Sequence, residues 1–93
     1  MTHLLIRHKV RNFDKWKVVF DQGQVQRAEL GCKGGTLYRT TADPNDVAIV
    51  FVWEDAKGAK AFVESSQLRK SMQEAGVINP PELRFLDLCE TFA

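Results

Sequence analysis

The feature that most constrains the fold is an unbroken apolar run of seven residues, from Val47 to Trp53. A strand with one solvated face alternates apolar and polar residues, but in this run the residues at both odd and even positions are apolar. Both faces of such a strand require burial. A membrane-spanning helix needs roughly 18–20 apolar residues, so we expect no membrane segment here.

Turn signals and hydrophobic periodicity around this run predict the order strand, helix, strand, strand, helix, strand. The predicted strands are residues 2–10, 36–41, 47–53 and 82–90, and the predicted helices are residues 13–30 and 56–75. Asn12 and Asp55 are the expected helix N-caps, and Ser65 either caps a further turn or breaks the second helix. Residues 31–35, which include three glycines, are expected to be a flexible connection.

This order predicts an α+β, ferredoxin-like βαββαβ fold with both helices on one face of a four-stranded antiparallel sheet. A chain of 93 residues cannot bury a second core, so residues 1–93 are expected to form a single domain. The opposite face of the sheet receives no helix. Since burial is required there too, the sequence predicts a homodimer in which two sheets pack face to face. The alternative is a monomer with a partly apolar open face.

Charge and composition exclude several function classes. Thirteen Lys and Arg residues against 12 Asp and Glu residues give a net charge of +1 without a basic cluster, which argues against nucleic acid as a partner. The N-terminus reaches a charged residue after three apolar ones, so no signal peptide is predicted and a cytoplasmic location is expected. Cys32 and Cys89 lack metal-ligand spacing, and His3 and His8 point to opposite strand faces, so no metal site is expected.

His8 is the candidate catalytic residue. Its side chain is expected on the same strand face as those of Leu4, Ile6 and Val10, in a strand expected to be central in the sheet. A half-buried imidazole can act as a general base or hydrogen-bond a phenol or carbonyl near neutral pH. The alternative is a structural histidine with satisfied hydrogen bonds, and parity alone does not decide which sheet face carries it.

A candidate ligand-binding set accompanies His8. Trp16, Tyr38, Trp53 and Phe62 could line an aromatic pocket between the helices and the sheet, although each could equally be packed in the core. Gly23 lies on the apolar stripe of the first helix, where glycine costs about 1 kcal/mol relative to alanine. Either the helix approaches the sheet closely there, or the glycine leaves space for a ligand.

Several short segments carry a family resemblance. They are residues 7–10 before 13–17, Gly35 with Tyr38 and Arg39, residues 51–55, residues 61–65, and residues 68–77. On these segments the chain resembles the dimeric α+β barrel superfamily, and within it the antibiotic biosynthesis monooxygenase-like and cyclase-like small proteins. The monooxygenase-like members often carry histidines where this chain has Phe62 and Gln67, and a glutamate where it has Phe51.

Two functions remain open. In the first, the chain is a dimer that binds a small apolar or aromatic molecule without turnover, which the missing histidines favour. In the second, it is a cofactor-independent monooxygenase or polyketide-cyclase-like enzyme that uses His8, which the resemblance and the aromatic set favour. We expect no cofactor for either function. For the second function, a deprotonated electron-rich aromatic substrate can itself react with dioxygen, and a folded, deprotonated polyketide chain can close a ring by an aldol reaction.

Overall fold

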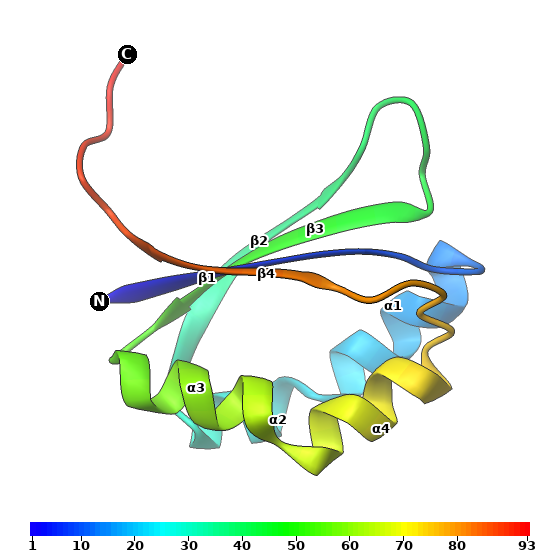
Figure 1. The fold of residues 1–93 in the computed structure, drawn as a ribbon, viewed down its shortest axis with the longest axis horizontal. Helices are drawn as coiled ribbons and strands as arrows, with labels where there is room; N and C mark the ends of the chain where they lie inside the picture. The colour runs from blue at the N-terminus through cyan, green and yellow to red at the C-terminus, as the bar shows by residue number, and fades with distance from the viewer.

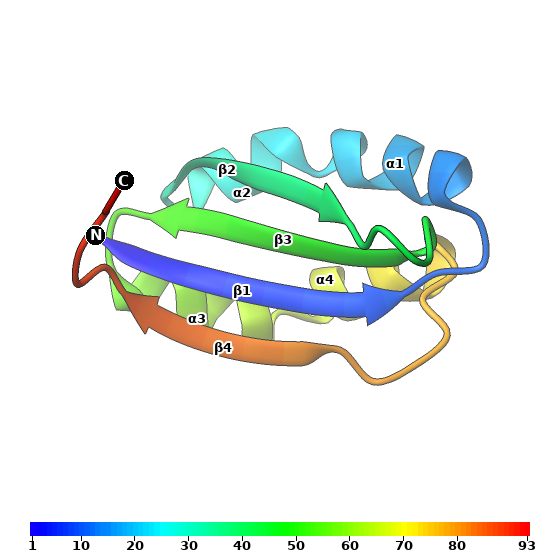
Figure 2. The ribbon, with the colours of Figure 1, turned by 90° about the horizontal axis from the view of Figure 1, so that it is seen from above.

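The computed structural model describes all residues from 1 to 93 and contains four strands and four helices. The elements are β1 (Thr2–Lys9), α1 (Phe13–Gln22), α2 (Gln24–Glu29), β2 (Cys32–Arg39), β3 (Asp46–Trp53), α3 (Ala56–Glu64), α4 (Ser66–Glu74) and β4 (Glu82–Asp87). The strands form one antiparallel sheet in the order β2-β3-β1-β4, and all helices lie on one face of it (Figures 1 and 2). The predicted ferredoxin-like α+β fold is confirmed.

The core lies between the sheet and the helices, and strand pairing decides which residues reach it. Residues paired across antiparallel strands share a face. Leu4 pairs with Phe51, and Ile6 pairs with Ile49. These residues face the helices, where they are buried together with Trp53. The two central strands, β1 and β3, therefore supply most of the core residues that come from the sheet.

Side-chain caps begin three of the four helices. Asn12 accepts a hydrogen bond from the Lys15 amide at 3.0 Å, and Asp55 accepts one from the Gly58 amide at 2.9 Å. Ser65 accepts one from the Leu68 amide at 3.1 Å while its own backbone is extended. Ser65 thus both ends α3 and caps α4, so the two sequence alternatives hold together and the predicted helix over residues 56–75 is divided at this residue. None of these helices has the length and apolar content needed to cross a membrane.

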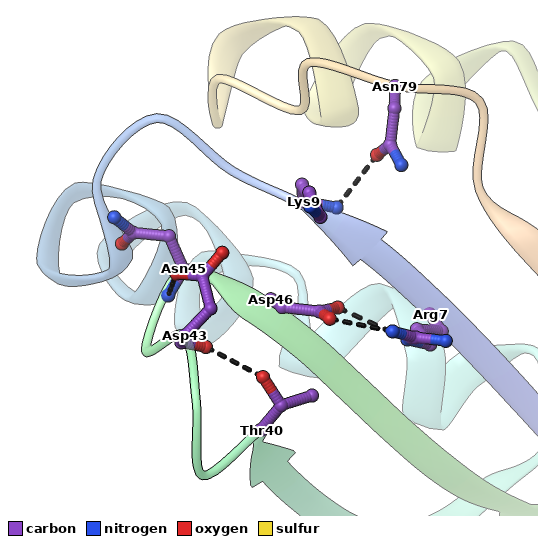
Figure 3. A network of polar contacts seen from close by, with 7 residues as sticks. All are labelled: Arg7, Lys9, Thr40, Asp43, Asn45, Asp46 and Asn79. Atoms are coloured by element: carbon purple, nitrogen blue, oxygen red, sulfur yellow. Dashed lines mark hydrogen bonds and ion pairs between the residues drawn. The ribbon is translucent and has the colours of Figure 1, made fainter.

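Polar contacts join the β2–β3 turn and the first residue of β3 to β1 and α1, and Figure 3 shows the pair between Asp46 and Arg7 of β1. Asp46, which is buried, accepts hydrogen bonds from Arg7 Nε at 3.2 Å and Nη2 at 2.7 Å. The hydrogen bond from Arg7 lowers the pKa of the Asp46 carboxyl below its usual value. The Asn45 side chain accepts from the Phe13 amide at 3.0 Å, and the Asn45 carbonyl accepts from the Val10 amide at 2.8 Å. The turn therefore holds the start of α1 beside the end of β1.

The prediction of one helix over residues 13–30 is wrong at Gly23, which separates α1 from α2. The carbonyl of Phe20 accepts from the Gly23 amide at 3.2 Å and from Arg27 Nη1 at 2.9 Å. The regular helical hydrogen-bond pattern is interrupted at the Phe20 carbonyl, because the Arg27 side chain donates a hydrogen bond to it.

The glycine-rich segment is also not the flexible connection that the sequence predicts, because β2 begins at Cys32. Gly35 pairs with Phe51, and a Cβ at Gly35 would collide with the Val50 carbonyl oxygen. The glycine is thus required for close strand approach. The last strand, predicted to reach residue 90, ends at Asp87, and the following residues stand clear of the sheet on the side away from the helices (Figure 1).

We expect Gly35→Ala to destabilise the fold by about 1–3 kcal/mol, because an added methyl group overpacks the β2–β3 contact. Thr36→Ala, at the exposed neighbouring position, is the control and should change stability by less than about 1 kcal/mol. Chemical denaturation of both variants measures the difference. Equal stability of the two variants would contradict the close approach at Gly35.

Candidate functional site

Two adjoining cavities lie between the helices and the sheet. The smaller, here called the His8 pocket, has a volume of about 60 Å³ and is bounded by His8, Trp16, Phe20, Phe62 and Met72 among others. Its walls come from the central strands and all four helices, with α4 contributing its apolar side. The pocket lies beneath the middle of the sheet.

The larger cavity, here called the β2 cleft, has a volume of about 540 Å³ and lies between the α1–α2 region and β2. Asp21, Arg27 and Lys33 are the charged residues that line it. Gly34 and Gly35 form part of its β2 wall and extend no side chain over it. Both cavities are bounded by Phe20, Arg27, Ile49 and Phe51, so these four side chains form the partition between them.

Aromatic rings line the path from His8 to the partition. His8 meets Trp16 edge-on with ring centroids 5.8 Å apart, and Trp16 stacks on Phe20 at 4.9 Å. Phe62 meets Phe51 edge-on at 5.6 Å. These contacts give the pocket flat, apolar walls of the kind that hold planar ligands.

His8 is the polar group at the end of this path. Its side chain is buried, and neither Nδ1 nor Nε2 has a hydrogen-bond partner within the protein. Burial lowers the pKa of His8 to about 4, against a weaker opposing effect of the Asp46 charge. The imidazole is therefore neutral near pH 7, with one nitrogen able to donate and the other able to accept. An unpartnered buried polar group costs about 1–3 kcal/mol, which a hydrogen-bonding ligand can offset.

The structure brings four of the six predicted site residues together. His8, Trp16, Gly23 and Phe62 all line the His8 pocket. Trp53 lies behind Phe62, at a ring distance of 5.1 Å, and is fully buried in the core without reaching either cavity. It supports the pocket wall instead of contacting a ligand.

Tyr38 was predicted to line the pocket, but in the structure it lines neither cavity. It pairs with Ala48 and is 54% exposed on the open face of the sheet, whereas its neighbour Leu37 pairs with Ile49 and faces the helices. The alternation of side chains along β2 therefore points Tyr38 away from both cavities.

Gly23 lines the pocket, but the space it leaves is occupied by a side chain of the protein itself. A Cβ at Gly23 would lie 2.8 Å from Nη1 of Arg27. The Arg27 guanidinium lies over the Phe20 ring at 4.1 Å and 5.8 Å from the Phe51 ring centre. The sequence analysis missed Arg27, although it falls four residues after Gly23 on the same helical stripe as Trp16.

Metal-ligating side chains do not gather anywhere in the structure: no group of three or more His, Cys, Asp or Glu residues could hold a metal ion. His3 pairs with Val52 on the open face, opposite to His8. Of the two cavities, the His8 pocket has His8 and Arg27 as its titratable lining residues.

Comparison with known proteins identifies the fold. No family model and no curated protein sequence matches the chain. Among solved structures, a proposed antibiotic biosynthesis monooxygenase from Bordetella bronchiseptica has a TM-score of 0.78 at 16% identity, covering 96% of this chain and 97% of its own. SnoaB, a cofactor-independent oxygenase from Streptomyces nogalater, also has a TM-score of 0.78 at 16% identity, covering 97% of this chain and 94% of its own.

A proposed antibiotic biosynthesis monooxygenase from Nitrosomonas europaea has a TM-score of 0.73 at 13% identity, covering 97% of this chain and 100% of its own. These similarities extend over almost the whole chain, and they confirm the suspected resemblance at the level of the fold. At such low identity they do not assign an activity.

The buried neutral His8 predicts a pH-dependent stability. Its pKa is about 4 in the folded state against about 6.5 in the unfolded state. The unfolded chain therefore binds more protons between these values, and stability rises with pH across this window and levels off above it. We expect wild type to lose about 2 kcal/mol from pH 7 to pH 5 through this group.

Denaturant titrations of wild type and His8→Phe at pH 5, 6 and 7 measure the effect. The phenyl ring keeps the pocket filled but cannot titrate, so the stability of wild type relative to His8→Phe should fall by about 2 kcal/mol from pH 7 to pH 5. His3→Gln is the control and should retain the His8-dependent loss. A constant difference between wild type and His8→Phe would show that His8 is not buried as a neutral group.

Proposed function

We propose that this protein binds a small aromatic molecule that carries a hydroxyl or carbonyl group, with the polar group against His8. The single observation that carries the proposal is a buried imidazole with two unpartnered nitrogens, lining an otherwise mainly apolar pocket. Ligand sites are typically apolar cavities with a few placed polar groups. His8 provides both hydrogen-bonding directions that such a ligand needs.

Cavity size indicates how the ligand lies. An apolar cavity of about 150 Å³ holds benzene, so the His8 pocket, at about 60 Å³, accommodates only the edge of a ring. The β2 cleft, at about 540 Å³, has the volume of a ligand site. We infer that the ring lies mainly in the cleft against Phe51. Its polar edge passes the side chains of Phe20 and Arg27 to reach His8.

A second candidate function is cofactor-independent oxygenation at this site. Neutral His8 can take a proton from an acidic aromatic compound such as an anthrone, leaving an electron-rich carbanion. The carbanion reduces dioxygen and forms a carbon–oxygen bond. One oxygen atom stays in the new carbonyl group, and the other leaves as water with both hydrogens of the former methylene. The substrate supplies all the electrons, so no cofactor is needed.

Two observations favour this second function: the free nitrogens of His8, and a fold similar to that of a cofactor-independent oxygenase. The same base could instead start a polyketide-like ring closure. Phe51 and Phe62, where the resembling enzymes often have Glu and His, favour binding without turnover. Both functions use the same cavities, but the oxygenase places the acidic methylene group of anthrone against His8, whereas simple binding places the carbonyl group there.

One experiment with anthrone distinguishes binding from turnover. We expect saturable quenching of tryptophan fluorescence, because Trp16 lines the pocket. An oxygenase would also consume dioxygen and form anthraquinone in equal amounts above the uncatalysed rate. His8→Phe should then lower turnover by about 10²–10⁴-fold, while Tyr38→Phe, on the other sheet face, should retain it. Quenching without oxygen uptake supports binding alone, and the absence of saturable quenching contradicts both functions.

We also propose a homodimer that packs two copies through their open sheet faces. Leu5, Val50 and Val52 are partly buried on this face, and Leu86 is 41% exposed beside them. The accessible surface of 6388 Å² exceeds the roughly 5,500 Å² of an ordinary monomer of 10.6 kDa. This excess comes from the uncovered sheet face together with the exposed residues after Asp87.

Light scattering coupled to size exclusion tests the dimer. We expect wild type to have twice the chain mass of 10.6 kDa. Val50→Glu places a charge at the centre of the proposed interface and should yield a folded monomer. Val18→Glu adds the same charge at an exposed position on α1 and should leave the dimer intact. Monomeric wild type at micromolar concentration would refute the interface.

A further inference from the structure

We propose that Arg27 binds an acidic group, so that the site selects an aromatic molecule with a carboxylate at one end and a hydroxyl or carbonyl at the other. This inference rests on the proposed binding site and specifies the class of ligand that it takes. The anion would lie in the β2 cleft, and the opposite polar edge would reach His8.

The first observation is that Arg27 forms no ion pair, although the Asp21 charge acts on it from beyond ion-pair distance. The ion pairs of the structure are Arg7 with Asp46, Lys17 with Asp21, Lys33 with Glu54, and Arg84 with Glu82. Of the three charged residues that line the cleft, Asp21 and Lys33 are therefore both paired, and Arg27 alone is not. A guanidinium group has five N–H donors. Only Nη1 of Arg27 donates within the protein, to the Phe20 carbonyl.

The second observation is that the guanidinium is held in place. It lies over the Phe20 ring at 4.1 Å, and Nη1 is fixed by its 2.9 Å hydrogen bond. Gly23 provides the space, since a Cβ there would lie 2.8 Å from Nη1. Arg27 is also partly buried, and this burial lowers its pKa without removing its charge. A positioned, partly desolvated cation binds a carboxylate more strongly than a mobile surface lysine does.

The third observation is the place of Arg27 in the partition between the two cavities. A ring in the cleft that contacts Phe51 also meets the guanidinium, because Arg27 lies 5.8 Å from the Phe51 ring centre. The glycines of β2 leave the opposite wall open. An acidic group on that ring can therefore reach Arg27 without displacing a side chain of β2.

A structural role is the competing explanation, in which Arg27 only caps the Phe20 carbonyl at the break between α1 and α2. This role predicts a loss of stability on substitution, with no effect on the choice between charged and neutral ligands. Two probes of nearly identical shape separate the explanations: 6-hydroxy-2-naphthoate, which is an anion, and 6-hydroxy-2-naphthamide, which is neutral. Each carries the hydroxyl group that His8 would bind.

Isothermal titration of both probes is the test. We expect wild type to bind the naphthoate at least tenfold more tightly than the naphthamide. Arg27→Gln should reduce this preference, which is the ratio of the two affinities, to less than twofold. Gly23→Ala keeps the charge but displaces the guanidinium, and should lower the preference at least threefold. Arg69→Gln makes the same substitution at an exposed site on α4 and is the control.

The outcomes distinguish this inference from the proposed function. Equal binding of both probes by wild type, or a preference that survives in Arg27→Gln, overturns the role of Arg27 and leaves the aromatic site standing. Failure of both probes to bind overturns both proposals. Weakening of both probes by His8→Phe, with the preference retained, supports the placement of the hydroxyl against His8 and of the acid against Arg27.

Discussion

The architecture depends on the burial of β3, which is apolar on both faces. One face of this strand packs against the helices through Ile49, Phe51 and Trp53. The other face, with Val50 and Val52, belongs to the uncovered side of the sheet. Because a single layer of helices covers one face only, the same strand forms the floor of the candidate site and leaves apolar side chains on the uncovered face of the sheet.

The site combines an apolar enclosure with two polar groups that the fold leaves unsatisfied. His8 is neutral because its surroundings are dry, and Arg27 is charged because a guanidinium does not lose its proton. One group suits a hydroxyl or carbonyl and the other suits an acid. Leaving both groups unsatisfied lowers the stability of the folded chain, which is typical of residues that serve binding more than stability.

Local sequence signals predicted most of the fold and part of the site. Alternation along β1 and the caps at Asn12 and Asp55 are short-range features, so they are visible in the chain. The strand at Gly35 depends on pairing with Phe51, a distant residue, and the low β-propensity of glycine concealed it. Arg27 was missed, although the helical stripe through Trp16 and Gly23 continues to it, and its lack of an ion pair follows only from the positions of every acidic side chain.

The break at Ser65 has a consequence for the wall of the His8 pocket. Phe62 belongs to α3, whereas Leu68 and Met72 belong to α4. Each helix is capped at its own start, and at the junction the Phe62 carbonyl accepts hydrogen bonds from both the amide and the hydroxyl of Ser65. The wall is thus assembled from two separately capped helices that meet at one extended residue, so the cap at Ser65, and not the end of α3, sets the direction from which Leu68 and Met72 face the cavity.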